Sequence, residues 1–122
     1  RFVSLEVWAG SKGPQRAVLE LDVDGTVQKA EATGDGPVDA TFKAIRAIYP
    51  HEAELTLYSV GAVTEGTDAQ AKVTVRLSEA GKTVDGQGAD TDTLVASARA
   101  YVHALNKLLV KRLRTAPAAL SA

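Results

Sequence analysis

The feature that most restricts the fold is a pattern that occurs twice along the 122 residues. Each unit has three segments with the alternating apolar residues of β-strands, followed by a glycine turn and a segment with helical spacing. The glycine turns match at an offset of 54 residues, since 88 − 34 = 54. The pattern predicts an internally duplicated βββα unit. At the same offset, the apolar residues of one strand coincide: Leu19, Leu21 and Val23 with Val73, Val75 and Leu77.

Turn residues set the limits of these elements. Asp24-Gly25 is a strong hairpin signal between two strands. Pro37 suits the first position of a helix, and Pro50 ends that helix because the residue before a proline avoids the α region. The predicted strands are 2–8, 17–23, 26–33, 53–63, 72–77 and 82–87, with a polar connection at 64–68, and the predicted helices are 37–49 and 93–113.

We therefore predict an α+β fold of two βββα units, with two helices packed on antiparallel sheet and exposed faces that pair with a second copy in a dimer. The first unit covers about 1–50 and the second about 51–114, within one domain of residues 1–114. The first strand alternates loosely, with Val3, Leu5 and Val7 on one face and Phe2 and Trp8 on the other.

Composition excludes several classes of protein. The formal net charge of −1 gives no general attraction to nucleic acid or to an anionic membrane. The absence of cysteine excludes disulfides and thiolate metal sites and is typical of a cytoplasmic protein. The absence of methionine predicts a piece of a longer protein. Residues 115–122, which hold Pro117 and several alanines, are predicted to be a flexible tail.

The sequence contains no recognisable catalytic constellation. The only histidines, His51 and His103, lack a partner at a metal-binding spacing, and both are predicted to lie at the surface. None of the serines lies in a nucleophile-elbow pattern. We therefore expect no catalytic residues and no metal ligands in this chain.

The turn at 34–37 is a candidate binding element. Glycines 34 and 36 permit backbone dihedrals that a Cβ would forbid, and the N–H groups of the helix that follows attract an anion. A carboxylate suits this position better than a phosphate, because Asp35 would repel phosphate and no lysine closes the turn as in a phosphate-binding loop.

Four carboxylates gather at the two predicted helix starts. Carboxylates are favoured there as caps of the helix N–H groups, and one or two of them can instead hold a ligand's ammonium group. An amino acid would use both kinds of contact, together with an apolar pocket for its side chain. The four carboxylates belong to Asp35, Asp39, Asp90 and Asp92.

Three separated motifs resemble the C-terminal allosteric domain of 2-isopropylmalate synthase. They are Ala-Thr-Gly-Asp-Gly-Pro-Val-Asp-Ala at 32–40, Gly-Thr-Asp-Ala-Gln at 66–70, and Gly-Gln-Gly-Ala-Asp-Thr-Asp at 86–92, which Val-Ala-Ser-Ala at 95–98 and Ala-Leu-Asn at 104–106 extend. The resemblance runs from about residue 2 to residue 110.

The resemblance implies a domain that dimerises and binds L-leucine, the end product of the pathway, to inhibit the enzyme. The parent would condense acetyl-CoA with 2-oxoisovalerate on a separate, metal-dependent TIM barrel. The fragment itself would then have no synthase activity and no cofactor.

By the same resemblance, the leucine site would include Gly34, Asp35, Gly36, Val38 and Asp39 at the first helix start, with Leu55, Tyr58, Ala62, Ala69 and Ala89. Leu55 and Tyr58 are an odd number of residues apart, so a regular strand would send them to opposite faces. Either the strand has a bulge or the pocket lies between two elements. Asp39 stands where some relatives have a small apolar residue.

Two alternatives stay open. The chain can be a purely structural dimerisation module, or it can be the equivalent isoleucine-sensing domain of a citramalate synthase. Binding of a nucleic acid is disfavoured, because the basic residues near the end of the last helix are typical of a solvated helix terminus and the aromatic content is low.

Overall fold

The structure, a computed structural model, describes residues 1–62 and 69–121. The order of elements is β1 (Phe2–Trp8), β2 (Gln15–Val23), β3 (Thr26–Gly34), α1 (Pro37–Ile48), β4 (Glu54–Ala62), β5 (Ala71–Glu79), β6 (Lys82–Asp90) and α2 (Thr93–Ser121). The predicted duplication of a βββα unit is therefore confirmed. Val63 at the predicted strand end and the connection at 64–68 lie outside the described residues.

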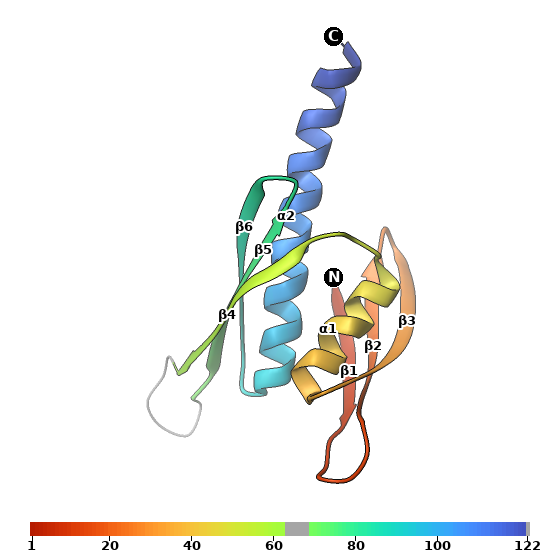
Figure 1. The fold of residues 1–122 in the computed structure, drawn as a ribbon, viewed down its shortest axis with the longest axis vertical. Coiled ribbons are helices and arrows are strands. Elements are labelled where there is room, and N and C mark those ends of the chain that lie inside the picture. Colours follow the sequence, from red (N-terminus) through yellow and green to blue (C-terminus); the bar gives the residue numbers. More distant parts are fainter. Residues whose placement is uncertain (63–68, 122) are drawn as a thin grey trace.

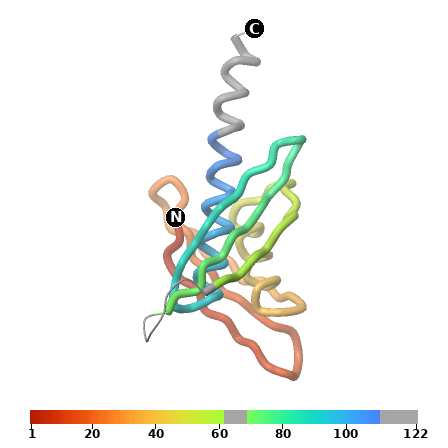
Figure 2. Tube along the Cα trace, turned by 90° about the vertical axis from the view of Figure 1, so that its left-hand side faces the viewer, coloured from red at the N-terminus to blue at the C-terminus, as the bar shows by residue number. Residues whose placement is uncertain are grey.

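The strands form two separate antiparallel sheets, one of β1-β2-β3 and one of β4-β5-β6. Helix α1 packs against β3 and β2, and α2 packs against β6 and β5. The two helices lie between the two sheets, as Figures 1 and 2 show. The predicted packing of two helices on antiparallel sheet is confirmed, with the sheet divided between the two units.

Helix α2 is longer than predicted. It continues to Ser121, past the predicted end at 113, and residue 122 lies outside the described part. The flexibility predicted for 115–122 stays a prediction.

From the second strand of each unit onward, the two units correspond at an offset of 56, so the predicted offset of 54 is wrong. The first strands correspond at an offset of 53, since Phe2 pairs with Leu21 and Leu55 pairs with Leu77. The hairpin turns begin at Asp24 and Ala80, which have φ values of 54° and 51°, and 80 − 24 = 56. The helices begin at Pro37 and Thr93, and 93 − 37 = 56. Side chains of a strand alternate with a period of two, so a slip of two residues preserves the apolar pattern and the sequence could not reveal it.

The first strand of each unit has a β-bulge. In β1 the register shifts between Phe2 and Ser4. The side chain of Val3 is consequently 42% exposed, whereas Phe2 and Leu5 pack against the core. The prediction that Val3 shares the face of Leu5 is wrong, because the bulge places Phe2 and Leu5, three residues apart, on the core side of the sheet.

Close backbone contact holds β6 against α2. A Cβ at Gly88 would lie 2.7 Å from the Ala100 backbone nitrogen, and a Cβ at Gly86 would collide with the carbonyl oxygen of Ala100 and the backbone nitrogen of Ala104. Glycine on the strand and alanine on the helix let these two elements approach more closely than larger side chains would permit.

The link between the units is part of the core. The side chain of His51 is only 8% exposed, so the prediction of a surface position is wrong for this residue. Its Nδ1 accepts the Ala53 N–H at 3.2 Å, and its Nε2 meets the Tyr101 hydroxyl at 3.0 Å. Burial raises the pKa of Tyr101. His103 does lie at the surface, and its Nδ1 accepts the Gln87 N–H at 3.0 Å.

Candidate functional site

The first helix begins with an open N-terminus. Its N-cap is Gly36, and no side chain caps the helix. The first backbone bond of the helix runs from the Ala40 N–H to the Gly36 carbonyl oxygen at 2.9 Å. Pro37 has no N–H, so the N–H groups of Val38 and Asp39 are the orphan donors of this first turn. The amides predicted to bind a carboxylate are therefore in place.

The reason for glycine in this turn differs from the prediction. Gly36 has φ −154° and ψ 173°, an extended conformation that any residue adopts, and neither Gly34 nor Gly36 has a positive φ. Gly34 is required by space, because a Cβ there would lie 2.5 Å from Oδ2 of Asp39 and 2.6 Å from the Ala40 nitrogen. The expectation of unusual dihedrals at these two glycines is wrong.

The second helix shows the same turn in a closed form. Oδ1 of Asp92 accepts the N–H groups of Leu94 at 2.8 Å and Val95 at 3.4 Å. At the offset of 56, Asp92 corresponds to Gly36, and the two N–H groups it binds correspond to those of Val38 and Asp39. The predicted capping role is confirmed for Asp92. The second unit thus carries its own carboxylate where the first unit has none.

Asp39 is engaged within its own helix start. Its Oδ2 accepts the Asp35 N–H at 3.0 Å and lies 3.1 Å from Nζ of Lys43. The hydrogen bond from Asp35 and, next, the contact with Lys43 lower the pKa of Asp39. Asp35 is exposed. Of these two carboxylates, Asp39 serves the turn itself and Asp35 points to solvent.

A bulge in β4 settles the odd spacing of Leu55 and Tyr58. The register shifts between Leu55 and Leu57, so that Leu55 pairs with Leu77 and Tyr58 with Val75. Directly paired residues lie on the same face of a sheet, and both partners are buried. Leu55 and Tyr58 therefore share the inner face, which confirms the first of the two explanations that the sequence left open.

The inner face of β4 is only partly covered. This strand is at the edge of its sheet, and α2 lies over the other two strands. Leu55 and Val60 are 43% and 46% exposed, although both face inward. The result is an accessible apolar surface on both sides of Tyr58.

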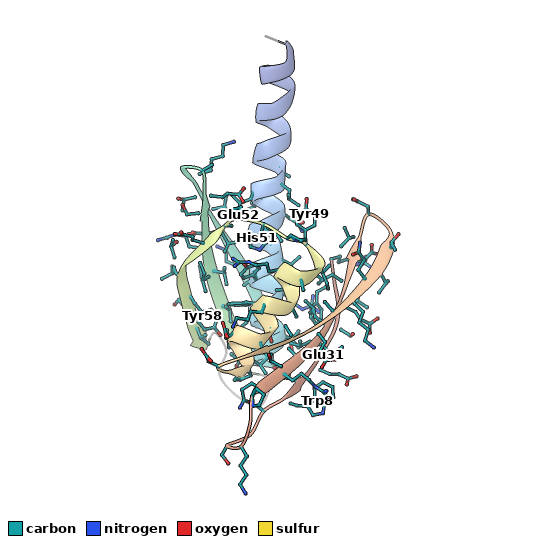
Figure 3. All side chains as sticks on the ribbon, turned by 45° about the vertical axis from the view of Figure 1, so that its right-hand side comes forward. Trp8, Glu31, Tyr49, His51, Glu52 and Tyr58 are labelled. Carbon is teal, nitrogen blue, oxygen red and sulfur yellow. The ribbon has the colours of Figure 1, made fainter. Side chains whose placement is uncertain are left out.

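Tyr58 connects this surface with both helices (Figure 3). Its ring meets the edge of the Phe42 ring on α1, with centroids 5.8 Å apart. Its hydroxyl lies 2.7 Å from Oγ of Ser97 on α2, and that Oγ donates to the Thr93 carbonyl oxygen at 2.7 Å. Because Ser97 uses its only hydrogen for Thr93, Tyr58 donates to Ser97. Phe42 is one helical turn beyond Val38, so the structure brings Tyr58 close to the open helix start.

The remaining predicted site residues lie in different places. Ala69 lines a depression of about 370 Å³ with Val60 and Thr93, at one end of the same β4 surface. The structure describes the backbone of Ala62 but not its side chain. Ala89 is on the outer face of β6, because its neighbour Gly88 faces α2. A single copy of the chain does not bring Ala89 beside Tyr58.

Sequence reasoning assigned no role to Phe42 or Ser97 in the site. The signal for Ser97 was present but depended on the correct offset: Thr41 and Ser97 are 56 residues apart, and each hydroxyl donates to the carbonyl oxygen four residues earlier. Within the described residues there is no group of three potential metal ligands. The helices of the described part include none with the length and apolar character that crossing a membrane requires.

Comparison with known proteins then decides the family. The profile described as "LeuA allosteric (dimerisation) domain" matches residues 1–109. The chain belongs to this family.

Similar proteins named 2-isopropylmalate synthase occur in several bacteria. The chain is 62% identical to the one from Methylobacterium nodulans over 89% of its own length and 21% of the relative. It is 60% identical to the one from Rhodopseudomonas palustris strain BisA53, over 98% of the chain and 23% of the relative. It is 59% identical to the one from Bradyrhizobium sp. strain BTAi1, over 93% and 22%. The chain thus spans about a fifth of these relatives, and the resemblance stated from the motifs is confirmed.

Proposed function

We propose that this chain is the regulatory domain of a cytoplasmic 2-isopropylmalate synthase and that it binds L-leucine for feedback inhibition. The family and the names of the relatives support the parent enzyme and a place in leucine biosynthesis. The condensation of acetyl-CoA with 2-oxoisovalerate would occur on a separate TIM-barrel domain, which uses a divalent metal.

The observation that carries the proposal is the difference between the two helix starts. The second unit holds a carboxylate, that of Asp92, on the N–H groups of Leu94 and Val95. The first unit offers the equivalent N–H groups of Val38 and Asp39 with glycine at the cap. A ligand's carboxylate at α1 would repeat the contacts that Asp92 makes at α2, and the helix dipole would favour its charge.

The surroundings of α1 suit the rest of an amino acid. The exposed carboxylate of Asp35 can pair with the ammonium group. Tyr58 and the half-exposed Leu55 supply apolar surface for a branched aliphatic side chain. Burial of such a side chain contributes about 1.5–3 kcal/mol, enough to favour leucine over smaller amino acids.

The exposed inner face of β4 also supports a homodimer. Leu55 and Val60 are apolar, exposed and on the same face of β4 as Tyr58, and a second copy that covers them would exclude water from the interface and from a ligand beside Tyr58. Leucine that binds one arrangement of the dimer more tightly would shift the population towards it, and the catalytic domain would respond to that shift.

Calorimetric titration with L-leucine, L-isoleucine, L-valine and D-leucine tests the proposal. We expect heat and saturation with L-leucine, and weaker binding for Asp35→Ala because the ammonium group loses its partner. A preference for L-isoleucine would instead identify a citramalate-type sensor. An absence of heat with every amino acid, together with a stable dimer in sedimentation, would leave a structural dimerisation module and refute the sensor.

A further inference from the structure

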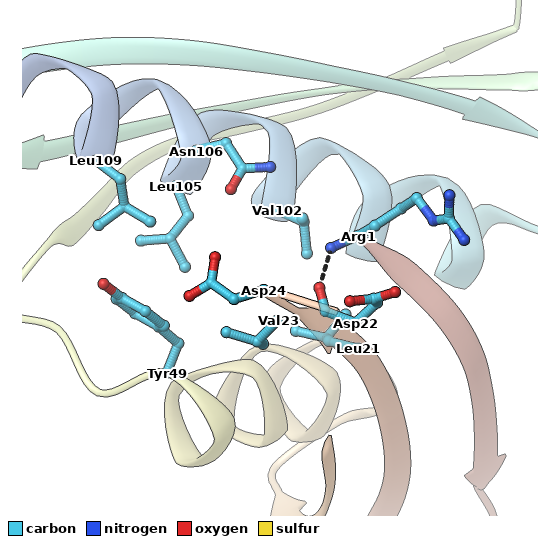
Figure 4. A pocket seen from close by; sticks show the side chains of 10 residues that line it. All are labelled: Arg1, Leu21, Asp22, Val23, Asp24, Tyr49, Val102, Leu105, Asn106 and Leu109. Atoms are coloured by element: carbon cyan, nitrogen blue, oxygen red, sulfur yellow. Dashed lines mark hydrogen bonds between the residues drawn. The ribbon is translucent and has the colours of Figure 1, made fainter. Parts of the chain in front are cut away.

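A cavity in the described part of the chain is lined by none of the residues proposed for the leucine site, as Figure 4 shows. Its volume is about 500 Å³, and it lies between the β2–β3 hairpin, the end of α1 and the middle of α2. Its apolar walls come from Leu21, Val23, Tyr49, Val102, Leu105 and Leu109, and Arg1 is at its edge. This size and lining are typical of a site that holds an apolar occupant.

Internal duplication identifies the equivalent region of the second unit. Arg1 exchanges backbone hydrogen bonds with Asp22, both at 2.7 Å, and Glu54 is the partner of Ser78. Asp22 and Ser78 are 56 residues apart, since 78 − 22 = 56. Arg1 therefore corresponds to Glu54. The position of the segment just before Glu54 indicates where a segment just before Arg1 would lie.

In the second unit, alternate residues of that preceding segment are buried, while Pro50 and Glu52 are exposed. Residues 50–53 run from α1 into β4, with His51 8% and Ala53 1% exposed. The Glu52 N–H donates to Oε2 of Glu79 at 3.1 Å, and Nη2 of Arg46 donates to the Ala53 carbonyl oxygen at 2.9 Å. The segment thus covers the end of its sheet and fills the space beside the helix.

We propose that, in the full-length protein, the segment leading into Arg1 lies in the cavity of the first unit, as residues 50–53 lie in the second. The residues first and third before Arg1 correspond to Ala53 and His51, and their side chains point into the cavity. Asp24 directs its carboxylate into this space in Figure 4 and accepts a backbone N–H of the segment. In the second unit the acceptor from Glu52 is Glu79, which corresponds to Val23, the residue next to Asp24. The connection to the rest of the protein is thereby held against both α1 and α2.

Thiol reactivity tests this placement, because the chain has no cysteine of its own. Leu109→Cys puts a thiol on the cavity wall, and Val110→Cys is the matched control, since Val110 is 45% exposed and lines a different depression on α2. Each variant is made in the chain that starts at Arg1 and in the full-length protein, with any other cysteine there replaced by serine.

We expect alkylation of Leu109→Cys to be slower by about tenfold or more in the full-length protein, because burial protects a thiol. Val110→Cys should react at the same rate in both. Equal rates for Leu109→Cys would overturn the proposal. The proposal would also be overturned if the thiol of Leu109→Cys were already protected in the shorter chain and this protection increased with protein concentration. A second copy of the chain would then be the occupant of the cavity.

Discussion

The substitution Gly36→Asp would give the first unit the cap that the second unit already has. The backbone of Gly36 is extended, with φ −154° and ψ 173°, and a Cβ built there meets no atom within 4 Å. Aspartate fits this position without strain. Its carboxylate would bond the N–H groups of Val38 and Asp39, as Asp92 bonds those of Leu94 and Val95 at 2.8 and 3.4 Å.

The substitution should raise stability and lower affinity for leucine at the same time. Replacing a glycine cap by aspartate contributes a few tenths of a kcal/mol, and the charge at the helix start adds about 0.3–1 kcal/mol. The ligand's carboxylate would lose its place on the two amides. One hydrogen bond to a charged group is worth about 1.5–3 kcal/mol, so the dissociation constant should rise about ten- to a hundredfold.

The assay combines calorimetric titration with L-leucine and unfolding by urea. Two variants serve as controls. Gly36→Ala adds a Cβ without a carboxylate and should keep most of the affinity. Asp92→Gly opens the start of α2 and should cost a few tenths of a kcal/mol for the lost cap and about 0.3–1 kcal/mol for the lost charge, while leaving the affinity at α1 unchanged.

A Gly36→Asp chain that is more stable and binds leucine as tightly as the unsubstituted chain would contradict this prediction. The aspartate would then occupy the amides without competing with the ligand. The leucine carboxylate would have to bind elsewhere.

Three further predictions concern stability. Gly86→Ala should destabilise the fold by about 3 kcal/mol, the upper end for overpacking, because the new Cβ meets backbone atoms of α2. Urea unfolding measures this change. Gly61→Ala is the control that should lose little stability, because its Cβ would meet nothing within 4 Å. Tyr58→Phe should cost about 0.5–1.5 kcal/mol through the lost hydrogen bond to Ser97, and an unchanged urea midpoint would contradict that bond. The pKa of Asp39 is lowered in the folded chain. The Asp39 carboxylate therefore stabilises the fold above its unfolded pKa of about 3.9, and this stabilisation is lost as pH falls through the folded pKa. Asp39→Asn should weaken the loss of stability in acid, and identical urea midpoints of the two chains at every pH would count against this prediction.

Local features of the sequence were sufficient for the elements and their order. The period of two in Leu19 and Leu21 and the Asp24-Gly25 turn depend on a few neighbouring residues, and so do the proline limits of α1. The motifs also identified the family, since they are read residue by residue. The sequence even required either a bulge or a pocket between elements at Leu55 and Tyr58, because an odd spacing on one face is impossible in a regular strand.

Long-range packing decided what those elements do together. An offset of 54 preserves strand alternation as well as 56 does, but it pairs Gly36 with Asp90 and hides the match with Asp92. The need for glycine at 34 arises over a shorter range, from Asp39 and Ala40 in the first turn of the helix that follows. Burial of His51 needs Tyr101, fifty residues away. The division into two sheets, the partial exposure of Leu55 and the position of Tyr58 between both helices likewise depend on contacts between distant segments, which periodicity does not encode.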